Sequence, residues 1–370
     1  MLSYVEDPRD NRGKKHDLCE ILALTVIGYL LGKTDFVNMA HCLRKEEKEL
    51  RRFLPLRNGI PSHDTFSRAM RIVEPKGLAF LVCDWFCCLA PAQGRHLAID
   101  GKGILAAAEK NHRENTPYLL NVLETASSMV LMQLKVGEKT NELGTIPELL
   151  KYLDLEGNTV TIDAIGTQKE IAREIVGRGG HFVLPVKENQ PLLLEEIRSF
   201  MEDEEEKRVM EEFFEEDKGH GRIEKRVSRV THDTSCIMSQ GFGCVKTIGK
   251  VERERGRITY TGDRIETEKE KQTVYYISDL ELGAEELARY VRGHWKVENE
   301  LHWVLDNCMK EDRSRARKGN AIQNLGLMRK VAYNILRLHG QKMPGHSMEY
   351  LIDELRYDIP MIIQYISSNL

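Results

Sequence analysis

The chain has 370 residues, of which 41% are hydrophobic and 30% charged, and its 54 Lys and Arg against 58 Asp and Glu give a net charge of -4. Such a chain is long enough for two or three domains and too hydrophobic to be disordered throughout. The longest apolar run, residues 21–31, is shorter than the roughly 20 residues of a membrane span, and the start MLSYVEDPRDNRGKK lacks the apolar core of a signal peptide. Eight Cys do not suggest a disulfide scaffold. We expect a reduced, cytoplasmic protein without a membrane segment.

The acidic residues are concentrated in one part of the chain. Residues 191–217 hold 12 acidic and 3 basic residues, a local charge of -9, so the rest of the chain carries +5. An acidic run of this kind is typical of a solvated face. The net charge therefore argues only mildly against a nucleic-acid partner, and its distribution is compatible with DNA.

The first 92 residues have the pattern of a helical region. Helix patterns cover residues 18–31, 36–53 and 80–89, and Pro61-Ser62-His63-Asp64 supplies helix-start chemistry before a further helix. Short helices with a Ser/Asp-capped third one suit a DNA-binding helix-turn-helix. Many helical bundles share this pattern, so the pattern alone favours an ordinary helical bundle.

Short β-rich runs follow. They are HLAIDGK (96–102), NVLETAS (121–127), MVLMQLKV (129–136), TVTIDAI (159–165) and HFVLPVK (181–187), with helix patterns at 146–153 and at 168–178, the latter closed by Gly179-Gly180. This order predicts a mixed α/β sheet over 93–190. Residues 191–280 predict an acidic helix and a β-rich insertion, 281–312 contain a long helix at 284–306, and 313–370 predict a basic helical region with helices at 320–340 and 348–365.

Two apparent motifs do not predict a site. The segment from Gly28 to Thr34 resembles a phosphate-binding loop, but it has three residues between the glycines where four are required, and it lies in a helix pattern. Cys83, Cys87 and Cys88 lack the paired spacing of structural zinc, and on an apolar helix we expect them to be packing residues. We expect no small-molecule cofactor.

Two acids end predicted strands. Asp100 follows Leu97-Ala98-Ile99, and Asp163 follows Val160-Thr161-Ile162. Ligand sites in α/β sheets gather at strand ends, so paired terminal carboxylates suit metal binding. A turn-forming Asp explains each position equally well, because a glycine follows each acid closely.

A third acid interrupts an apolar helix face. The apolar stripe of the predicted helix 284–306 runs in steps of three and four through Leu287, Val291, His294 or Trp295, Leu301 and Leu305. Glu298 falls within this stripe, where a buried carboxylate is costly unless it is paired or binds a cation. Glu300 is turned roughly 200° away and can pair with Lys296. The pattern therefore favours Glu298 as the functional acid.

The three acids Asp100, Asp163 and Glu298 predict a metal site. Carboxylates without a thiolate or a zinc-type cluster favour the hard cation Mg²⁺, with Mn²⁺ as its substitute. Two such ions can activate an attacking oxygen and stabilise a leaving one in phosphoryl transfer.

Several strings of this sequence resemble a family of bacterial insertion-sequence transposases that includes the H-repeat-associated proteins. These strings are DPRDNRGKKH, GIPSHDTFSR, AIDGK, TIDAIGTQ, VKENQ, GHGRIEKR and GHWKVENELHWVLDNCMKEDRSR, in the same order from about Asp7 to about Arg337. The chain departs from the family at 103–107. It also has His294 and Leu305 where a related Tyr–Arg–Glu–Lys signature has Arg and Lys.

The resemblance implies a ribonuclease H-like catalytic core with an Asp–Asp–Glu triad, interrupted by a β-rich insertion before the Glu helix and flanked by helical N- and C-terminal regions. Carried over by position, the triad is Asp100, Asp163 and Glu298. The implied activity is metal-dependent cleavage and strand transfer of transposon-end DNA into target DNA by a homodimer, with residues 1–92 as the candidate end-binding region.

The resemblance also suggests DNA contacts. Candidates beside the matching strings are Lys102, Lys187, Gln190, Arg292, Trp295 and His302, and the basic stretch adds Arg313, Arg315, Arg317 and Lys318, with Arg329 and Lys330 further on. Basic side chains neutralise phosphates and make binding salt-dependent. A structural role is an equal alternative for each of the first six. Two further alternatives are a catalytically silent DNA-binding relic and a ribonuclease H-like DNA nuclease that does not transfer strands.

Overall fold

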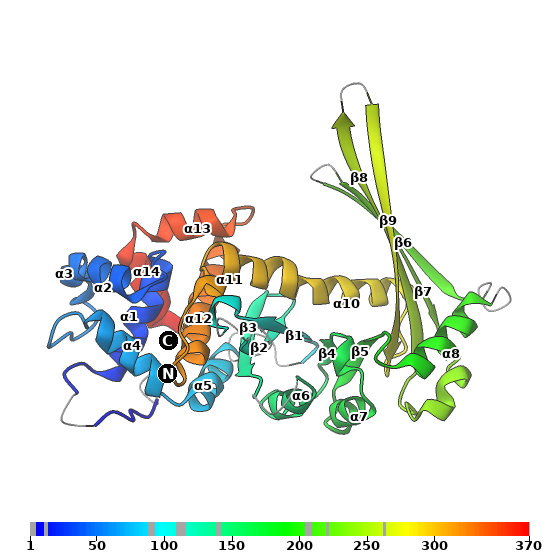
Figure 1. Cartoon of the computed structure of the whole chain (residues 1–370), viewed down its shortest axis with the longest axis horizontal. Helices are drawn as coiled ribbons and strands as arrows, with labels where there is room; N and C mark the ends of the chain where they lie inside the picture. Colours follow the sequence, from blue (N-terminus) through cyan, green and yellow to red (C-terminus); the bar gives the residue numbers. More distant parts are fainter. Residues whose placement is uncertain are drawn as a thin grey trace. The chain divides into compact units, whose positions relative to one another are not determined.

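The computed structural model describes residues 5–10, 14–87, 93–108, 116–137, 142–203, 209–219, 222–261 and 264–369 (Figure 1). The chain forms two compact units. The first comprises Met1–Ala92, Asp100–Thr145 and Lys296–Leu370, and the second comprises Gln93–Ile99 and Ile146–Trp295. None of the helices in the described ranges has the length and hydropathy needed to cross a bilayer.

The strands hydrogen-bond in the order β3-β2-β1-β4-β5-β9-β8-β7-β6. Their bounds are β1 (His96–Gly103), β2 (Tyr118–Glu124), β3 (Met129–Lys135), β4 (Thr159–Ile162), β5 (His181–Val186), β6 (Glu211–Gly219), β7 (Arg222–Thr231), β8 (Thr247–Thr261) and β9 (Arg264–Ser278). β1, β4 and β5 pair in parallel, whereas β2 and β3 form an antiparallel hairpin. The order β3-β2-β1-β4-β5 is that of a ribonuclease H-like mixed sheet, and the predicted fold class is confirmed.

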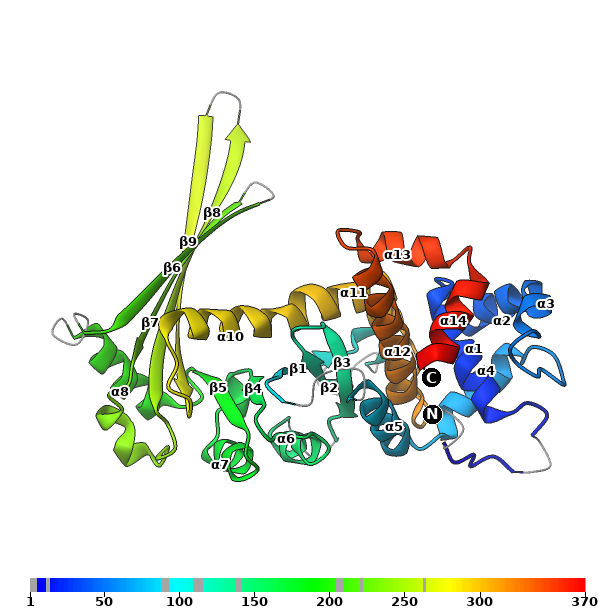
Figure 2. The ribbon, with the colours of Figure 1, turned by 180° about the vertical axis from the view of Figure 1, so that it is seen from behind.

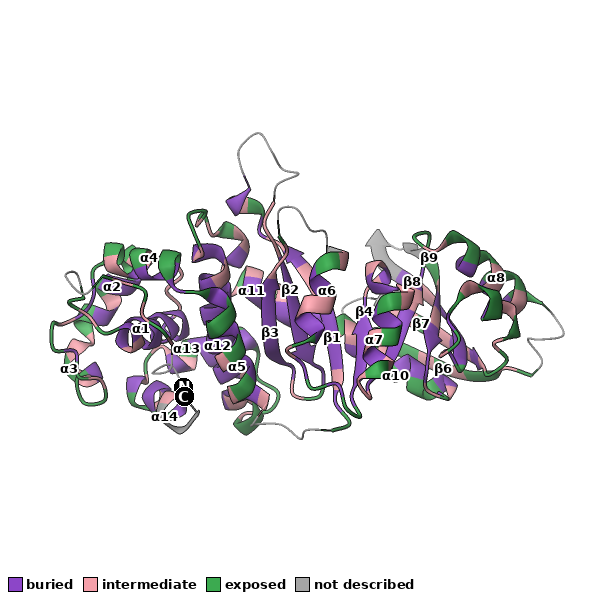
Figure 3. Cartoon of the chain, turned by 90° about the horizontal axis from the view of Figure 1, so that it is seen from below, coloured by how far each residue is buried: buried purple, intermediate pink, exposed green. Residues whose placement is uncertain are grey.

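The first unit is mainly helical. It contains α1 (Leu18–Leu30), α2 (Phe36–Lys45), α3 (Glu47–Leu50), α4 (His63–Ile72), α5 (Pro75–Cys87), η3 (Leu105–Ala107), η7 (Val297–His302), α11 (Trp303–Asn307), η8 (Glu311–Arg313), α12 (Ala321–Lys342), α13 (Met348–Leu355) and α14 (Ile359–Asn369). α1 begins at Asp17, whose carboxylate accepts the backbone N–H groups of Cys19 and Glu20. It is apolar on all sides, and a helix of this kind must be buried. Accordingly α1 packs against α12, which lies beside it in Figure 2 and is largely buried in Figure 3.

Polar side chains of α12 bind neighbouring backbone. Asn334 is fully buried; its Oδ1 accepts the Val130 N–H at 2.8 Å, and its Nδ2 donates to the Val130 carbonyl at 2.7 Å. The Asn334 side chain thus satisfies the Val130 backbone at the edge strand β3 in the way that a neighbouring strand would. Asn324, also fully buried, donates to the carbonyls of Met70 and Val73 at the end of α4.

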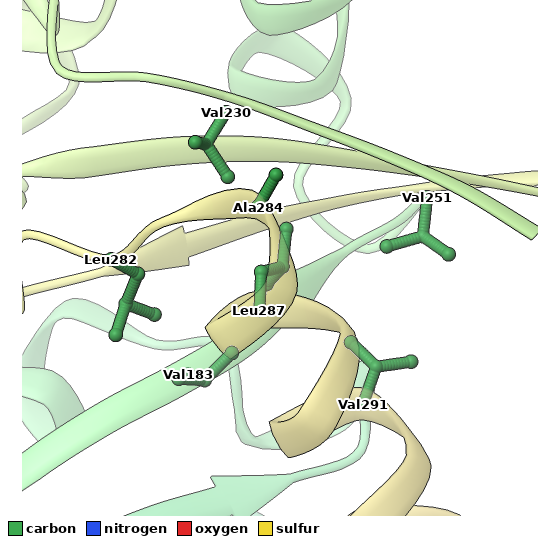
Figure 4. Packing of buried hydrophobic residues seen from close by; sticks show 7 residues of the cluster. All are labelled: Val183, Val230, Val251, Leu282, Ala284, Leu287 and Val291. Atoms are coloured by element: carbon green, nitrogen blue, oxygen red, sulfur yellow. The ribbon is translucent and has the colours of Figure 1, made fainter. Parts of the chain in front are cut away.

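The second unit contains the first part of β1 and the strands β4 to β9. Its helices are η5 (Ala164–Gly166), α7 (Lys169–Gly177), α8 (Pro191–Glu202), η6 (Ser235–Gln240) and α10 (Ala284–Lys296), while α6 (Glu142–Leu150) begins in the first unit. As predicted, α7 is closed by Gly179, which has a positive φ of 72°. α10 buries an apolar face. Figure 4 shows the cluster, formed by Val183, Val230, Val251, Leu282, Ala284, Leu287 and Val291. Leu287 enters a notch at Gly249 of β8, where a Cβ would lie 2.3 Å from Leu287 Cδ2.

The β-rich insertion is an antiparallel ribbon of β6, β7, β8 and β9. Its charges pair across strands, as in Arg229 with Glu212 at 2.6 Å and Arg255 with Glu224 at 3.3 Å. The acidic run 191–217 is divided between the helix α8 and the strand β6, and on β6 the side chains of Glu212 and Glu215 pair with Arg229 and Arg226 of β7.

Three helices predicted as continuous are divided. The helix expected at 284–306 consists of α10, the π-helix η7 and α11. The helix expected at 36–53 is α2 followed by the short α3, and the one expected at 348–365 is α13 and α14, separated at Asp358, whose side chain accepts the Met361 N–H at 2.9 Å. The end of the predicted helix 80–89, the Cys88 position and the turn at 220–221 lie outside the described residues.

Candidate active site

Asp100 lies in β1 directly after the last residue of the parallel β1–β4 register. Its side chain is 16% exposed, and its Oδ2 lies 3.6 Å from Nδ1 of His302, which is 14% exposed. Burial, together with the positive charges of Lys102 and Lys330, lowers the pKa of His302 to about 3. The imidazole beside Asp100 is therefore neutral at physiological pH. Asp100 and His302 both belong to the first unit.

Asp163 lies at the end of β4 and begins the 3₁₀ helix η5, which belongs to the second unit. Its Oδ1 accepts the Ile165 N–H at 3.1 Å, so the turn-forming role considered from the sequence is present. Burial raises the pKa of Asp163 above its usual range, although the backbone hydrogen bonds and the charge of Lys187 act in the opposite direction. A nearby cation would favour the ionised carboxylate.

The strand register relates the positions of these two acids along the chain. Ile99 pairs with Ile162 in the parallel β1–β4 register, and Asp100 and Asp163 are the next residues on each strand. The carboxyl ends of parallel strands are where ligands bind in open α/β sheets. Asp163 directly follows β4, as predicted, whereas β1 continues past Asp100 to Gly103, so that only its pairing with β4 ends before Asp100.

Glu298 is exposed, and the expectation that it faces the core was wrong. The buried positions around it are Val297 and Leu301, both 0% exposed. Glu298 lies in η7, where the wider π-helical turn changes which side chains face inward, and a stripe drawn with regular α-helical steps misses that change. Glu300 does not pair with Lys296 but with Arg337 at 2.7 Å, while the Lys296 ammonium donates to the Thr125 carbonyl.

The two positions at which the chain departs from the Tyr–Arg–Glu–Lys signature are occupied by structural side chains. His294 places Nδ1 3.0 Å from the Thr161 hydroxyl, and burial lowers its pKa to about 4. Leu305 is fully buried. Neither side chain offers a positive charge at neutral pH.

Lys102 was expected to contact DNA, but the structure buries it. Its side chain is 7% exposed, and its ammonium donates to Asp306 and, at 2.9 Å, to Asp312. Burial alone would lower the pKa of Lys102, but the charge of Glu311 and the two hydrogen bonds outweigh it and raise that pKa. A phosphate could reach this ammonium only by displacing its carboxylate partners.

The other candidate DNA contacts differ in whether their side chains already have a partner within the protein. Gln190 donates to the Thr167 carbonyl at 2.9 Å, Arg292 pairs with Glu215 at 2.7 Å, and Trp295 lies under the guanidinium of Arg253. Each of these three therefore has a contact within the second unit. Lys187 is exposed and close enough to Asp163 to affect its pKa.

The basic stretch after Glu311 is exposed. Arg313, Arg315, Arg317 and Lys318 all face solvent, and within the described parts of the chain none of them forms an ion pair. Ala316 between them packs against the small apolar cluster that includes Ile104 and Ile322. Arg329 and Lys330, counted with this stretch from the sequence, are instead 2% and 1% exposed, so that part of the prediction was wrong.

The acids that contact Lys102 were not found from the sequence. Asp306 follows His302 by four residues, a spacing that places both side chains near one side of the helical segment. This spacing was the available signal, but an acid near the end of a charged helix is usually solvated.

The donor chemistry of Asp100, Asp163 and Glu298 suits a hard divalent cation, because each offers carboxylate oxygens. Among the residues that the structure describes, no three His, Cys, Asp or Glu side chains form a group that could hold a metal ion. Two of the acids belong to the first unit and Asp163 to the second.

Comparisons with known proteins place these features in a sequence family. Residues 1–86 match the family described as DDE_Tnp_1-associated, and residues 91–335 match the one described as Transposase DDE domain. The chain is 31% identical to YncI of Escherichia coli O157:H7, named as a candidate transposase, over 91% of this chain and 86% of that one. It is 32% identical to YhhI of Escherichia coli K12, named as an H-repeat-associated candidate transposase, over 90% of this chain and 89% of that one.

One solved structure is also similar. The cryo-EM structure of the piggyBac transposase synaptic complex with hairpin DNA aligns with 97% of this chain and 76% of that one, at 12% identity and a TM-score of 0.44. Because this TM-score is low, nothing further is inferred from that likeness.

Proposed function

Because the chain belongs to the Transposase DDE domain family, we propose that it is a DNA transposase that cleaves the ends of an insertion sequence and joins them to target DNA. The observation that carries this proposal is the match over residues 91–335, which contains the predicted catalytic acids. The reaction proposed is phosphodiester hydrolysis followed by attack of the freed 3′-hydroxyl on a target phosphodiester.

Asp100, Asp163 and Glu298 are the proposed catalytic residues. Support for the first two comes from the β1–β4 register, in which both acids follow paired residues at the carboxyl ends of parallel strands. Support for Glu298 comes from its exposure, since a carboxylate that acts on DNA must be accessible. The neutral imidazole of His302 beside Asp100 leaves that carboxylate without a competing positive charge from the imidazole.

The proposed cofactor is Mg²⁺, with Mn²⁺ as a substitute, held by the carboxylates of these three acids. Such ions lower the pKa of attacking water and stabilise a leaving oxygen. The protein's part is to present the carboxylates in ionised form and to hold the phosphodiester backbone beside them.

Arg313, Arg315, Arg317 and Lys318 are the proposed phosphate-binding residues. They are exposed and carry no ion pair within the described ranges, so their charges are available to DNA. Ala316 anchors the segment to the first unit by its apolar contact. Lys187 is a further candidate because it is exposed near Asp163.

The helical region 1–92 is the proposed end-recognition region. α4 begins at Ser62, whose side chain accepts the Thr65 N–H, and it presents Arg68 and Arg71 to solvent. A capped helix with exposed arginines suits insertion into a DNA groove. We propose that two copies act together, one at each end of the element.

The experiment that tests the proposal uses a DNA duplex carrying the inverted repeat that flanks the reading frame. With Mg²⁺, the wild-type chain is expected to nick this duplex, and chelation of the metal with EDTA should stop cleavage. Asp100→Asn, Asp163→Asn and Glu298→Gln should each reduce the cleavage rate by roughly 10³-fold or more while retaining end binding. Glu300→Gln is the matched control, because Glu300 lies two residues from Glu298 and pairs with Arg337.

The outcomes separate the alternatives. Cleavage that persists in all three acid variants contradicts the assignment of the triad. End binding without Mg²⁺-dependent nicking by the wild-type chain indicates a silent relic. Nicking without joining of precut ends to target DNA indicates a nuclease that does not transfer strands.

A further inference from the structure

A buried group of charged side chains lies in the first unit next to Asp100. We call it the Lys102 cluster; it comprises Lys102, Asp306, Glu311, Asp312 and Lys330. The Lys102 ammonium contacts Asp306, Asp312 at 2.9 Å and Glu311 at 3.9 Å. Lys330 donates to Glu311 at 3.3 Å, so this carboxylate is shared by two ammonium groups.

The cluster joins four elements of the first unit. Lys102 is on β1, Asp306 on α11, and Glu311 and Asp312 on η8, while Lys330 belongs to α12. Lys102, Glu311 and Lys330 are 7%, 1% and 1% exposed. The charges of these three side chains are therefore shielded from solvent, whereas the side chains of Asp306 and Asp312 are 31% and 33% exposed.

The geometry aligns β1 with the helical segment that carries Glu298. Asp100 and Lys102 are two residues apart on one strand, so both side chains project from the same face, about 6.7 Å apart. His302 and Asp306 are four residues apart on the helical segment, about 6 Å along its axis. The two spacings match, and Asp100 lies 3.6 Å from His302 while Lys102 contacts Asp306.

Glu298 lies on the same helical segment, one π-helical turn before Trp303, whose N–H bonds to the Glu298 carbonyl. Two contacts between a strand and a helix fix both the distance between them and the position of the helix along the strand axis. The contact between Lys102 and Asp306 is the stronger of the two, because it joins opposite charges and its ammonium is buried. It therefore sets where the helical segment that carries Glu298 lies along β1.

Stability alone does not account for this arrangement. Replacing a buried ion pair by apolar side chains is often neutral or stabilising. Directional contacts between charged groups, by contrast, specify one arrangement where apolar packing allows several. A cluster two residues from a catalytic acid suits a role in placing that acid.

We propose that Lys102 is a positioning residue, which holds Asp100 of β1 in fixed register with Glu298 through its contact with Asp306. This inference rests on the proposed function, because it assigns the Asp100 and Glu298 carboxylates to one reaction. It replaces the expectation that Lys102 contacts DNA.

The test separates binding from cleavage. Binding of the inverted-repeat duplex is measured in EDTA at several salt concentrations, and the single-turnover cleavage rate of the bound complex is measured after addition of Mg²⁺. Lys102→Met should keep the affinity and its salt dependence, since the ammonium does not reach DNA. It should slow cleavage by about 100-fold or more, the cost of misplacing a reacting group by about 1 Å. Lys102→Arg should recover part of the rate.

Two control variants accompany it. Lys330→Met removes an equally buried ammonium from the same Glu311 without touching β1, so it should lower the melting temperature while leaving cleavage of the bound complex nearly unchanged. Arg315→Gln removes a proposed phosphate contact, so it should weaken end binding and reduce the salt slope by about one. Lys330→Met thus gives the result expected for a purely structural residue, and Arg315→Gln gives the result expected for a DNA contact.

Three results would overturn the inference. They are cleavage by Lys102→Met at the wild-type rate, loss of affinity and salt slope like that of Arg315→Gln, or an equal loss of cleavage in Lys330→Met. If Lys102→Met does not fold, Asp306→Asn tests the same contact from the other side, and a wild-type cleavage rate in that variant contradicts the inference.

The wild-type reference distinguishes this inference from the proposed function. A wild-type chain that cleaves, together with a Lys102→Met variant that cleaves equally well, removes the positioning role alone. A wild-type chain that binds the duplex but does not cleave it with Mg²⁺ removes both.

Discussion

The helical run from Ala284 to Asn307 makes different kinds of contact in its first and in its later part. Its first part, α10, packs within the second unit through apolar side chains, with Leu287 and Val291 in the cluster of Figure 4. Its later part, η7 and α11, also buries apolar side chains, among them Val297, Leu301 and Leu305, but adds directional polar contacts within the first unit. His302 lies beside Asp100, and Asp306 contacts Lys102.

The difference between these two parts follows from the kinds of force involved. Burial of apolar area is non-directional and is roughly proportional to the area removed from water. Charge-assisted hydrogen bonds require particular distances and angles. The part that carries Glu298 is therefore the part whose register is fixed most closely, while α10 contributes mostly to the free energy of folding.

The largest effect on stability is expected from the apolar part. Leu287→Ala removes a side chain that is 1% exposed and fills the notch at Gly249, so it should lower the free energy of unfolding by about 4 kcal/mol. Urea denaturation measures this change. Leu192→Ala on α8 is the control, because Leu192 is 65% exposed and should change stability little. Equal effects of the two variants would contradict the role given to the cluster.

A pH-dependent effect of intermediate size is expected from His294. Its pKa is lowered to about 4 by burial and by the charge of Lys187, and the Thr161 hydroxyl that it contacts also contacts His96. Between pH 6.5 and about 4 the unfolded state binds the proton more readily, so stability falls as the pH falls through this window.

The His294→Gln variant isolates this contribution. The stability of the wild type relative to the variant should decrease by on the order of 3 kcal/mol between pH 7 and pH 4. Denaturation curves of both proteins across this range give the difference, in which other titrating groups cancel. A difference that does not change with pH would show that the imidazole is not held neutral by burial.

The smallest effect is expected from an ion pair of the polar part. Glu300 and Arg337 are 2.7 Å apart with side chains 33% and 23% exposed, so water and salt screen their attraction. Glu300→Gln should cost less than about 1 kcal/mol, and less still at high salt. Denaturation at two salt concentrations measures this, and a large salt-independent cost would place Glu300 among the register-fixing contacts.

Most of the core sheet could be predicted from the sequence because its strands have distinct β-rich runs. The end of β4 at Asp163 was predicted for the same reason, since an acid after three apolar or β-branched residues interrupts an apolar run, whereas β1 continues past Asp100 to Gly103. Whether these acids and Glu298 catalyse a reaction stays a prediction.

The environments of single side chains could not be predicted in the same way. The exposure of Glu298 depends on the π-helical turn of η7, which regular helical spacing does not reveal. The burial of Lys102 depends on acids more than 200 residues further along the chain, such as Asp306, and local patterns contain no information on such partners. Arg329 and Lys330 were counted as exposed basic residues for this same reason.

The Asn334 contact with β3 has a consequence for shortened copies of the gene. The strand order ends at β3, and α12 supplies the groups that satisfy the Val130 backbone there. A chain interrupted before α12 would leave that strand edge open to pairing with other chains. Truncated chains of this kind should therefore accumulate as aggregates.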